Sequence, residues 1–293
     1  MARFDLSAPA VKLLREITLG DSTVIQSMAF TDDWMYTVQV ANGGVKLPGE
    51  PAVVSGTDRY NRGDLTVTRL GLDGVINGEM HLMGSGHGVS MSTQVTGSTT
   101  YLWTETNSVN ARGTDLCRFT FVSGTIYYPC SPYIEVFPFD MGYNVTPSID
   151  GSRLAVRYVP DAGVDFRFAI FDLDDFVSGG RTPIIDIAAP DTVYTFQGWC
   201  LYDGHIYTLE GDSYGSVPDS DVPTGNTHIT IVDAATGSVV DRQLTRAAYT
   251  LDYREPEGLT VQHAQAGPRL CMGFASGASG DRVASVYYKS ALI

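Results

Sequence analysis

The chain has 293 residues, of which 43% are hydrophobic and 11% aromatic. This is enough to bury a sizeable core, so an intrinsically disordered chain is excluded. The formal net charge of −14 and the pI near 4.6 exclude partners that are recognised through a basic surface, such as nucleic acid or an anionic membrane.

The N-terminal residues MARFDLSAPAVKLLREITL lack an apolar core of signal-peptide length, and no run of about eighteen apolar residues follows anywhere in the chain. We therefore expect a protein that is made in the cytoplasm, without a signal peptide and without a membrane-spanning segment. Residues 12–19, KLLREITL, are predicted to form a β-strand, although their pattern would also suit a short helix.

Two kinds of strand-like segment alternate along the rest of the chain. Segments of the first kind follow a turn cluster and begin at residues 34, 101, 153, 205 and 269; those of the second kind begin at residues 64, 115, 166, 227 and 281. An inner strand precedes each pair, and an outer strand follows four of the five pairs. Short strands that recur every fifty residues or so are typical of β-propeller blades.

The sequence therefore predicts an all-β fold, a single five-bladed β-propeller over residues 1–293. The blades are expected at about residues 24–84, 87–130, 144–189, 195–244 and 257–289, with TIYYPC at 125–130 as the outer strand of the second blade. The fifth blade ends without an outer strand, and an open ring would leave two sheet edges unpaired. We expect the strand at 12–19 to complete the fifth blade and close the ring.

The inner strands, once aligned, place small and polar residues in one column. Its members are Gln26-Ser27, His87-Gly88, Thr146-Pro147, Gln197-Gly198 and Glu257-Gly258. Small residues are needed where inner strands converge at the axis, and polar neighbours would line a wet channel. We predict an axial polar ring of Gln26, His87, Gln197 and Glu257, with Arg254 and Glu255 in its entry loop and an Arg254–Glu257 ion pair as a structural clamp.

The same residues admit an enzymatic interpretation. Glu255 and Glu257 could form the pair of carboxylates that glycoside hydrolysis requires, and His87 could act as a general base. The glycines around His87 do not form a phosphate-binding loop, because a strand rather than a helix follows them. We predict no catalytic residues and interpret the ring as architectural, with a hydrolase as the alternative.

Acidic residues in the loop at 211–226 raise the possibility of a metal site. Asp212, Asp219 and Asp221 could offer oxygen ligands to calcium, but their spacing matches no calcium-binding loop, and a solvated loop is the simpler interpretation. We predict neither a metal nor a cofactor.

The four cysteines show no metal-type spacing. They are Cys117, Cys130, Cys200 and Cys271. Thiols buried in or beside strands are the simplest interpretation, and a Cys117–Cys130 disulfide is the alternative.

Several phrases of the sequence together resemble one family. They include VIQSMAF from residue 24, MHLMGSGHGVS from residue 80 and YTLDYREPEGLTV from residue 249. They are similar to the five-bladed propeller of receptor-binding proteins from tailed phages of Gram-positive hosts. The same propeller occurs in teichoic acid biosynthesis protein C and in helveticin J-type bacteriocins. The resemblance spans residues 12–289, and the missing export signal favours a virion component over a secreted bacteriocin.

The resemblance implies a tail-tip, baseplate or tail-fibre protein that binds a Gram-positive cell-wall glycopolymer. It would be assembled in the host cytoplasm, in several copies per particle, in contact with other tail proteins. The alternatives are a purely structural tail protein and a bacteriocin-like protein that binds or processes wall glycans. Aromatic rings on which sugars could stack are Tyr60, Trp103, Tyr133, Trp199, Tyr214 and Tyr249, although for the two tryptophans packing inside the blades is the favoured alternative.

Overall fold

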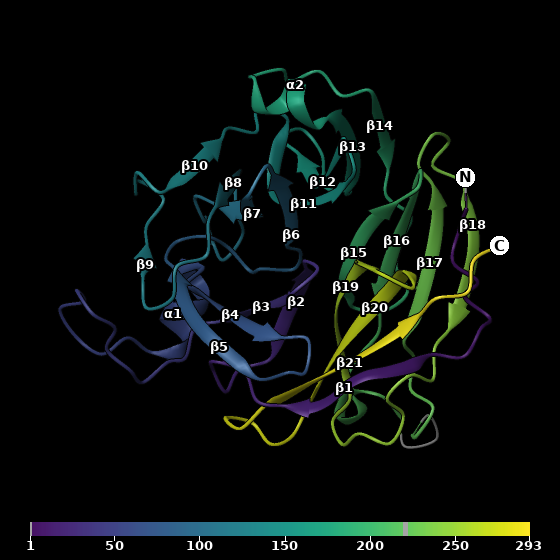
Figure 1. Cartoon of the computed structure of the whole chain (residues 1–293), viewed down its shortest axis with the longest axis horizontal. Coiled ribbons are helices and arrows are strands. Elements are labelled where there is room, and N and C mark those ends of the chain that lie inside the picture. The colour runs from purple at the N-terminus through teal and green to yellow at the C-terminus, as the bar shows by residue number, and fades with distance from the viewer. Residues whose placement is uncertain (1, 219–221) are drawn as a thin grey trace.

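Five antiparallel β-sheets surround a central axis in the computed structural model, which describes residues 2–218 and 222–293 (Figure 1). The prediction of an all-β, five-bladed propeller is confirmed. The helices in the described residues are short: α1 (Gly56–Arg62), α2 (Leu173–Val177) and the 3-10 turn η1 (Tyr214–Ser216). None of them is long and apolar enough to cross a membrane.

Each blade contains four strands in antiparallel order, and a fifth strand extends the first blade. The first blade consists of β2 (Ile25–Phe30), β3 (Trp34–Val40), β4 (Leu65–Gly71) and β5 (Ile76–Leu82). The second consists of β6 (Ser92–Thr96), β7 (Thr99–Thr106), β8 (Asp115–Phe119) and β10 (Ile134–Phe137). The third consists of β11 (Gly142–Asp150), β12 (Arg153–Pro160), β13 (Arg167–Asp172) and β14 (Ile185–Ala188). The fourth consists of β15 (Phe196–Tyr202), β16 (His205–Glu210), β17 (His228–Asp233) and β18 (Val239–Leu244).

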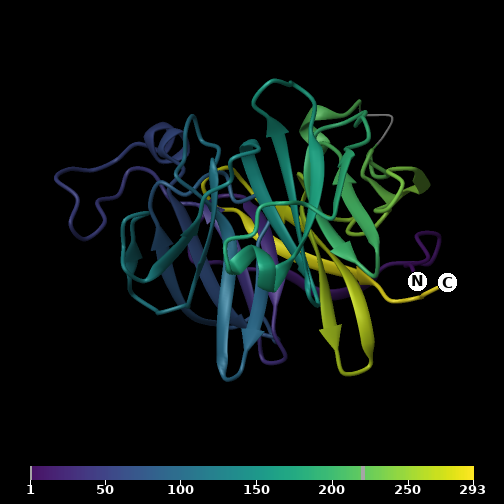
Figure 2. The same cartoon turned by 90° about the horizontal axis from the view of Figure 1, so that it is seen from above.

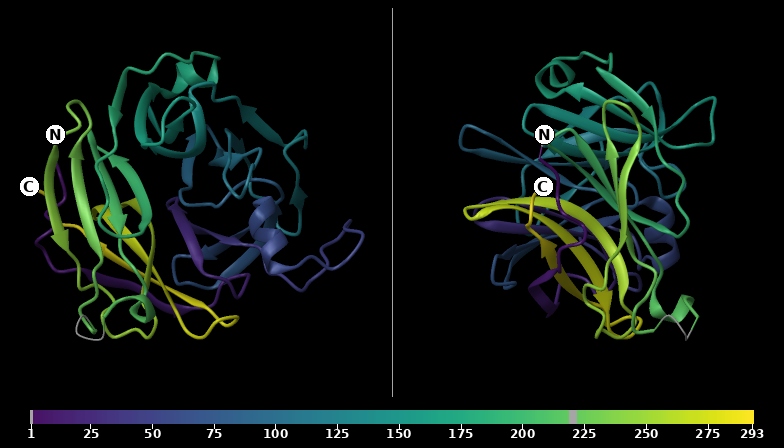
Figure 3. Two further views of the ribbon diagram at one scale, coloured as in Figure 1. Left: turned by 180° about the vertical axis from the view of Figure 1, so that it is seen from behind. Right: turned by 90° about the vertical axis from the view of Figure 1, so that its right-hand side faces the viewer.

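The fifth blade joins the two ends of the chain. Its inner strands are β19 (Glu255–Ala264), β20 (Gly267–Ser276) and β21 (Val283–Lys289), and β1 (Val11–Ile17) pairs antiparallel with β21 as the outermost strand. The N-terminal strand therefore closes the last blade, as expected. The termini lie side by side (Figures 1 and 3), where the amide of Arg3 donates to the carbonyl of Ile293 at 3.1 Å.

The hydrophobic core is divided among the five joints between neighbouring blades. One cluster, for example, packs Phe168 and Ile170 of the third blade against Trp199 and Leu201 of the fourth. Another packs Leu102 and Cys117 of the second blade against strands β3 to β5 of the first. Strand β2 is covered on both faces by two of these clusters, and every one of its residues is buried.

The outer strand of the second blade differs from the prediction. Residues Ile126–Tyr127 form β9, which runs parallel to β5 and so extends the first blade. The fourth strand of the second blade is instead β10, held in register on β8 by an ion pair of 2.7 Å between Arg118 and Glu135. The physical reason is packing: Tyr127 is buried at the joint between the first and second blades, whereas Phe137 stacks on Trp103 at 4.7 Å.

The ring has two different faces, which Figure 2 shows in side view. Tight turns between first and second strands, at residues 31–33, 97–98, 151–152, 203–204 and 265–266, lie on one face, here called the hairpin face. The connections between second and third strands and those between consecutive blades lie on the other, here called the loop face. The longest described parts of the loop face are residues 41–64, 83–91, 107–114, 211–218 and 245–254.

Closure of the ring leads to a first prediction. Deleting residues 1–20 removes β1, exposes the edge of β21 and opens the fifth blade, so we expect loss of the cooperative thermal transition rather than a small decrease in Tm. As the matched control, residues 2–20 are attached after Ile293 through a short flexible linker, which the adjacent termini permit. This permuted chain should recover the transition. A truncated protein with unchanged Tm would contradict the role given to β1.

Candidate functional site

A cavity of about 220 Å³ opens at the axis on the loop face. Its lining combines amides, aromatic rings and two cations, from Gln26, His87, Val89, Arg112, Asn144, Arg157, Phe166, Thr195, Phe196, Gln197 and Glu257. Pockets for drug-sized ligands measure about 300–1,000 Å³. The axial cavity therefore has room for one small group rather than for several sugar units.

Irregularities in four inner strands turn polar side chains toward the axis. In β2 and β15 the bulged residues are Gln26 and Gln197. In β11 and β19 two residues face one on the partner strand, and these pairs include Asn144 and Glu257. A β-bulge shifts the alternation of side chains and re-aims one of them. The axial polar residues are thus a product of bulges at equivalent positions in four blades.

The structure brings together Gln26, His87, Gln197 and Glu257 from the expected ring, all in the wall of this cavity. The third blade differs from the aligned column, which contained Thr146. The bulge of β11 places Asn144, two residues earlier, at the cavity. Thr146 instead accepts a hydrogen bond of 2.9 Å from the indole of Trp199.

The inner strands approach one another closely at this level. Gly258 has a φ of +74°, and a Cβ there would lie 2.8 Å from the Cα of Ser27 in the first blade. A side chain at residue 258 would therefore collide with backbone, which explains the glycine beside Glu257.

Arg254 and Glu255 do not line the cavity, and the predicted Arg254–Glu257 ion pair is wrong. Arg254 is fully buried below the loop at 245–254, where its guanidinium donates to the carbonyls of Thr245 and Ala247 at 2.8–3.0 Å and to the hydroxyl of Thr227 at 2.8 Å. The guanidinium thereby replaces backbone partners that an irregular loop cannot supply. The carboxylate of Glu255 accepts a hydrogen bond of 2.8 Å from Tyr253.

His87 is positioned by a buried carboxylate in the second blade. Glu105 accepts hydrogen bonds from the backbone amides of His87 at 3.0 Å, Gly88 at 2.7 Å and Gly113 at 2.5 Å. Those amides belong to the two loops that carry His87 and Arg112 to the cavity. Burial raises the pKa of Glu105 to about 7, although the three amides oppose this. Burial and the charge of Arg112 lower the pKa of His87 to about 4, so this ring is neutral near pH 7.

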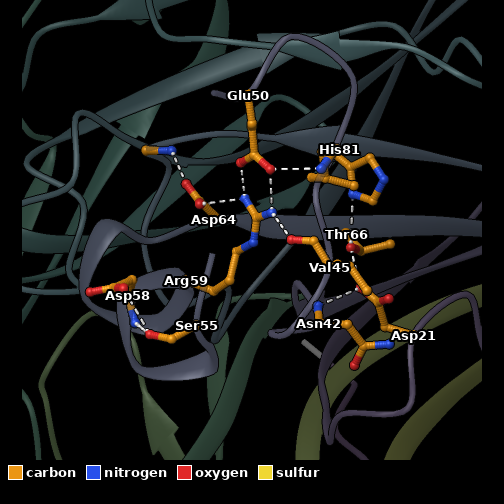
Figure 4. Close-up of polar contacts among 12 residues, drawn as sticks. Asp21, Asn42, Val45, Glu50, Ser55, Asp58, Arg59, Asp64, Thr66 and His81 are labelled. Atoms are coloured by element: carbon orange, nitrogen blue, oxygen red, sulfur yellow. Dashed lines mark hydrogen bonds and ion pairs between the residues drawn. The ribbon is translucent and has the colours of Figure 1, made fainter. Parts of the chain in front are cut away.

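A second polar cluster fixes helix α1 on the loop face (Figure 4). The guanidinium of Arg59 is fully buried and bridges Glu50 and Asp64, and its Nη1 lies 3.0 Å from Asp64. Asp64 also accepts a hydrogen bond of 3.1 Å from the amide of Gly84 in the loop that contains His87. The next residue of the helix, Tyr60, lies edge-on against His87 with ring centroids 5.3 Å apart. Tyr60 is 41% exposed.

The two arginines of the cavity were missed by the sequence analysis. Arg157 is 8% exposed and lies between the rings of Phe166 and Phe196, with its guanidinium carbon 3.3 and 3.7 Å from their centroids. Arg112 donates to the carbonyl of its neighbour Ala111 at 3.1 Å. One signal was available: Arg157 is the only charge inside the otherwise apolar run LAVRYV.

Burial also controls the charges of the cavity. It raises the pKa of Glu257 well above its usual value, and nearby Glu255 contributes in the same direction. Burial, together with Arg112, lowers the pKa of Arg157 to about 9, which still leaves it protonated near pH 7. The cavity therefore combines two cations with a carboxyl group that favours its neutral form.

The six aromatic candidates for sugar contact divide into three groups. Trp103 and Trp199 are fully buried between blades and cannot contact a ligand from solution, which agrees with the packing role favoured for these two. Tyr133 is 68% exposed but stacks on Tyr127 beside the added strand β9, away from the axial cavity. Only Tyr60 contacts a residue of the cavity wall.

The remaining two candidates lie together on another part of the loop face. The hydroxyl of Tyr214 donates to the carbonyl of Tyr249 at 3.1 Å, and Tyr249 is 52% exposed. Both lie outside the lining of the axial cavity.

No cluster of metal-binding side chains occurs among the described residues. The carboxylate of Asp212 accepts from Thr195 at 2.6 Å and from Asn226 at 2.8 Å, while Asp219 and Asp221 lie outside the described part of the chain. Cys117 is buried and Cys130 is exposed, and both are free thiols.

A larger depression of about 920 Å³ lies at the same axis on the hairpin face, lined by residues of all five inner strands. Its hydroxyl groups are used to join blades: the amides of Ile149 and Leu201 donate to Ser92 and Ser148 at 3.1 and 2.8 Å. These two serines therefore join neighbouring blades.

The fold and the cavity define a propeller disc whose loop-bearing face is hollowed at the axis. A family model described as the phage 5-bladed beta propeller receptor binding platform domain matches residues 24–288. The chain belongs to this family of phage receptor-binding domains.

Individual relatives agree with this assignment. A Bacillus subtilis (strain 168) protein that carries the name major teichoic acid biosynthesis protein C is 28% identical over 302 residues, which cover 97% of this chain and 63% of that protein. The tail fibre of Staphylococcus aureus phage P68 matches with a TM-score of 0.72 at 14% identity, over 98% of this chain and 54% of the fibre. The chain thus spans less than two thirds of the length of either relative.

The same fold also occurs in enzymes. A GH43 β-xylosidase/α-arabinofuranosidase from a compost microbial metagenome matches with a TM-score of 0.52 at 10% identity, over 98% of this chain and 95% of the enzyme. Similarity at this level of identity shows a shared fold and says nothing about a shared activity.

Removal of the buried cation in α1 gives a second prediction. Arg59→Met leaves Glu50 and Asp64 buried without their partner, and we expect the free energy of unfolding to decrease by about 3–5 kcal/mol. Arg62→Met, in the exposed last turn of the same helix, is the matched control and should change it by less than about 0.5 kcal/mol. Chemical denaturation compares them, and equal effects of the two substitutions would contradict the anchoring role of Arg59.

The pKa of Glu105 gives a third prediction. The pKa of Glu105 is about 7 in the folded protein and 4.5 ordinarily, so the unfolded chain releases this proton at lower pH. The free energy of unfolding that Glu105 contributes therefore decreases as pH rises between these two values. Glu105→Gln lacks this titration. The free energy of unfolding of the wild type minus that of the variant should fall by about 2–3 kcal/mol from about pH 5 to about pH 8. A difference that is constant or rises with pH would contradict the raised pKa of Glu105 in the folded protein.

Proposed function

We propose that this propeller is the part of a phage tail-tip, baseplate or tail-fibre protein that binds a glycopolymer of a Gram-positive cell wall through its loop face. The observation that carries the proposal is the axial cavity, where amides, aromatic rings and cations from several blades meet around a space for one small group. Membership in the phage receptor-binding family supports a receptor as the ligand. The tail fibre and the teichoic acid-related protein, as relatives, support the cell wall as its source.

The chemistry of the cavity favours binding over hydrolysis. Most glycoside hydrolases need two carboxyl groups about 5–9.5 Å apart, one on each side of the scissile bond. Among the residues that line the axial cavity, Glu257 is the single carboxyl group, and Glu255 is engaged by Tyr253 outside it. Amide side chains such as Gln26 and Gln197 offer both donors and acceptors to sugar hydroxyls.

Weak individual contacts suffice for attachment if the particle carries several copies. Linked sites that engage one surface can gain about 10²–10⁴ in apparent affinity over a single site. We therefore expect weak binding by the isolated domain and firm binding by an array of copies, in a tail complex with other tail proteins.

Incubation with purified Gram-positive cell walls tests the proposal. We expect the protein to co-sediment with walls without releasing sugar. Tyr60→Ala should weaken retention by roughly tenfold, because one partly exposed ring is lost beside the cavity. Tyr133→Ala removes an even more exposed ring away from the cavity and should leave retention unchanged.

Two other outcomes would contradict the proposal. Release of sugar that Glu257→Gln abolishes would indicate a hydrolase. Neither retention nor release, on walls from the host range of the related phages, would indicate a purely structural tail protein.

A further inference from the structure

The starting observation is that the guanidinium of Arg157 has no hydrogen-bond partner in the described chain. Its Nε is buried and unpaired, and the residue lines both the axial cavity and a smaller cavity of about 140 Å³ that Asp165 and Asp191 also line. A buried charge is normally paired or fully hydrogen-bonded, because removal from water costs several kcal/mol. An arginine that is 92% removed from solvent and still unpartnered therefore needs an explanation beyond folding.

Comparison with the other arginines that lie over aromatic rings shows that Arg157 is exceptional. Each of the others within the described residues donates at least one hydrogen bond to the protein; they are Arg69, Arg118, Arg181, Arg254, Arg269 and Arg282. Arg157 is the one arginine of this group that contacts aromatic rings without donating a hydrogen bond to the described residues. Aromatic packing by itself therefore does not account for the free donors.

The two phenylalanines fix the plane of the guanidinium. Phe166 and Phe196 cover its two faces, at 3.3 and 3.7 Å from the guanidinium carbon. All five N–H donors of arginine lie in that plane and form a fork that matches two oxygens of a carboxylate or phosphate. A guanidinium clamped in this way can donate only at its edge, and part of that edge faces the cavity.

Of the two cavities that Arg157 lines, the axial one favours a negative ligand, whereas the smaller one already contains Asp165 and Asp191. Arg112 reaches the same cavity from the second blade, and the two cations are close enough for Arg112 to lower the pKa of Arg157. Neither arginine forms an ion pair with a described carboxylate. In a chain with a net charge of −14, two unpaired arginines in one small cavity are a local reversal of charge.

We propose that the axial cavity binds one oxyanion, the phosphate or carboxylate group of an acidic cell-wall glycopolymer, with Arg157 as its main ligand and Arg112 as the second cation. This rests on the proposed function and specifies its ligand: the polymer is anionic, and a single acidic group enters the cavity. The amides of Gln26, Asn144 and Gln197 are then available to adjacent hydroxyls.

Titration with small probes at low ionic strength tests the site independently of cell walls. The probes are glycerol phosphate, glucuronate and, as the neutral control, glycerol, with binding followed by calorimetry. The wild type should bind at least one of the acidic probes saturably and not bind glycerol. Saturation by glycerol phosphate alone would identify a phosphate ligand, and saturation by glucuronate alone a carboxylate. Absence of binding by both acidic probes would overturn the proposal.

Two variants keep the test specific. Arg157→Met retains an unbranched chain between the two rings, and we expect it to weaken binding of the acidic probe by about tenfold or more. Arg69→Met is the matched control, because Arg69 also lies between two rings, at 4.7 and 4.6 Å from Trp34 and Phe121, but outside the cavity. It should bind like the wild type. Equal binding by wild type and Arg157→Met would refute the assignment of Arg157.

Thermal stability provides a second readout. Because Arg157 is buried without a partner, Arg157→Met should leave Tm unchanged or raise it, whereas a structural arginine would lower Tm when replaced. A large decrease in Tm would overturn the proposal.

Cell walls separate this inference from the proposed function. If the wild type and Arg157→Met bind walls equally, the oxyanion site is refuted while wall binding stands. If the wild type binds no wall, the proposed function fails, and saturable binding of an acidic probe would still support the oxyanion site.

Discussion

Pairing between β1 and β21 is the interaction on which the rest of the structure depends. It joins residues near the two ends of the chain, Val11 with Tyr288 and Ile17 with Ala284, and it completes the fifth sheet and so closes the ring. The connection from β1 to β2 then bonds the first blade to the fifth: Gln39 of β3 donates to the carbonyls of Asp21 and Thr23, and the amide of Arg282 donates to Ser22. The axial cavity exists only because this ring is closed, since its lining comes from all five blades.

A closed ring places five inner strands around one axis, and the bulges decide what those strands present to it. Regular alternation would direct apolar residues of β2 and β15 toward the joints between blades on both sides. A bulge at Gln26 and at Gln197 interrupts this alternation near the loop face, and those at Asn144 and Glu257 do the same in two further blades. The second blade has no such bulge. It contributes His87 and Arg112 from two loops, and backbone amides of the His87 loop donate to Glu105 and Asp64.

The fold could be predicted because its signals are local and repeated. Turn clusters and alternating strands mark each blade, and the missing outer strand of the fifth blade identifies the partner of the N-terminal strand. The error in the second blade arose because Ile126–Tyr127 has a strand sequence whose partner is set by packing across a joint. The axial residues Gln26, His87, Gln197 and Glu257 could be aligned by position, but Asn144 was missed because a bulge of two residues shifts the register of β11. Arg157 was missed because a residue on a second strand reaches the axis only through three-dimensional packing.

The two ends of the axis show how one scaffold separates stability from recognition. On the hairpin face, Thr93 and Ser148 form hydrogen bonds between neighbouring blades, with residues 63 and 53 positions away in the chain. On the loop face the same axis keeps the Nδ1 of His87 and the Nε of Arg157 buried and unpaired. Unpaired buried polar groups destabilise a protein, and they persist where the surrounding structure is rigid enough to hold them and a ligand completes their bonding. A closed propeller supplies that rigidity, so unsatisfied polar groups at the loop-face end of its axis are tolerated.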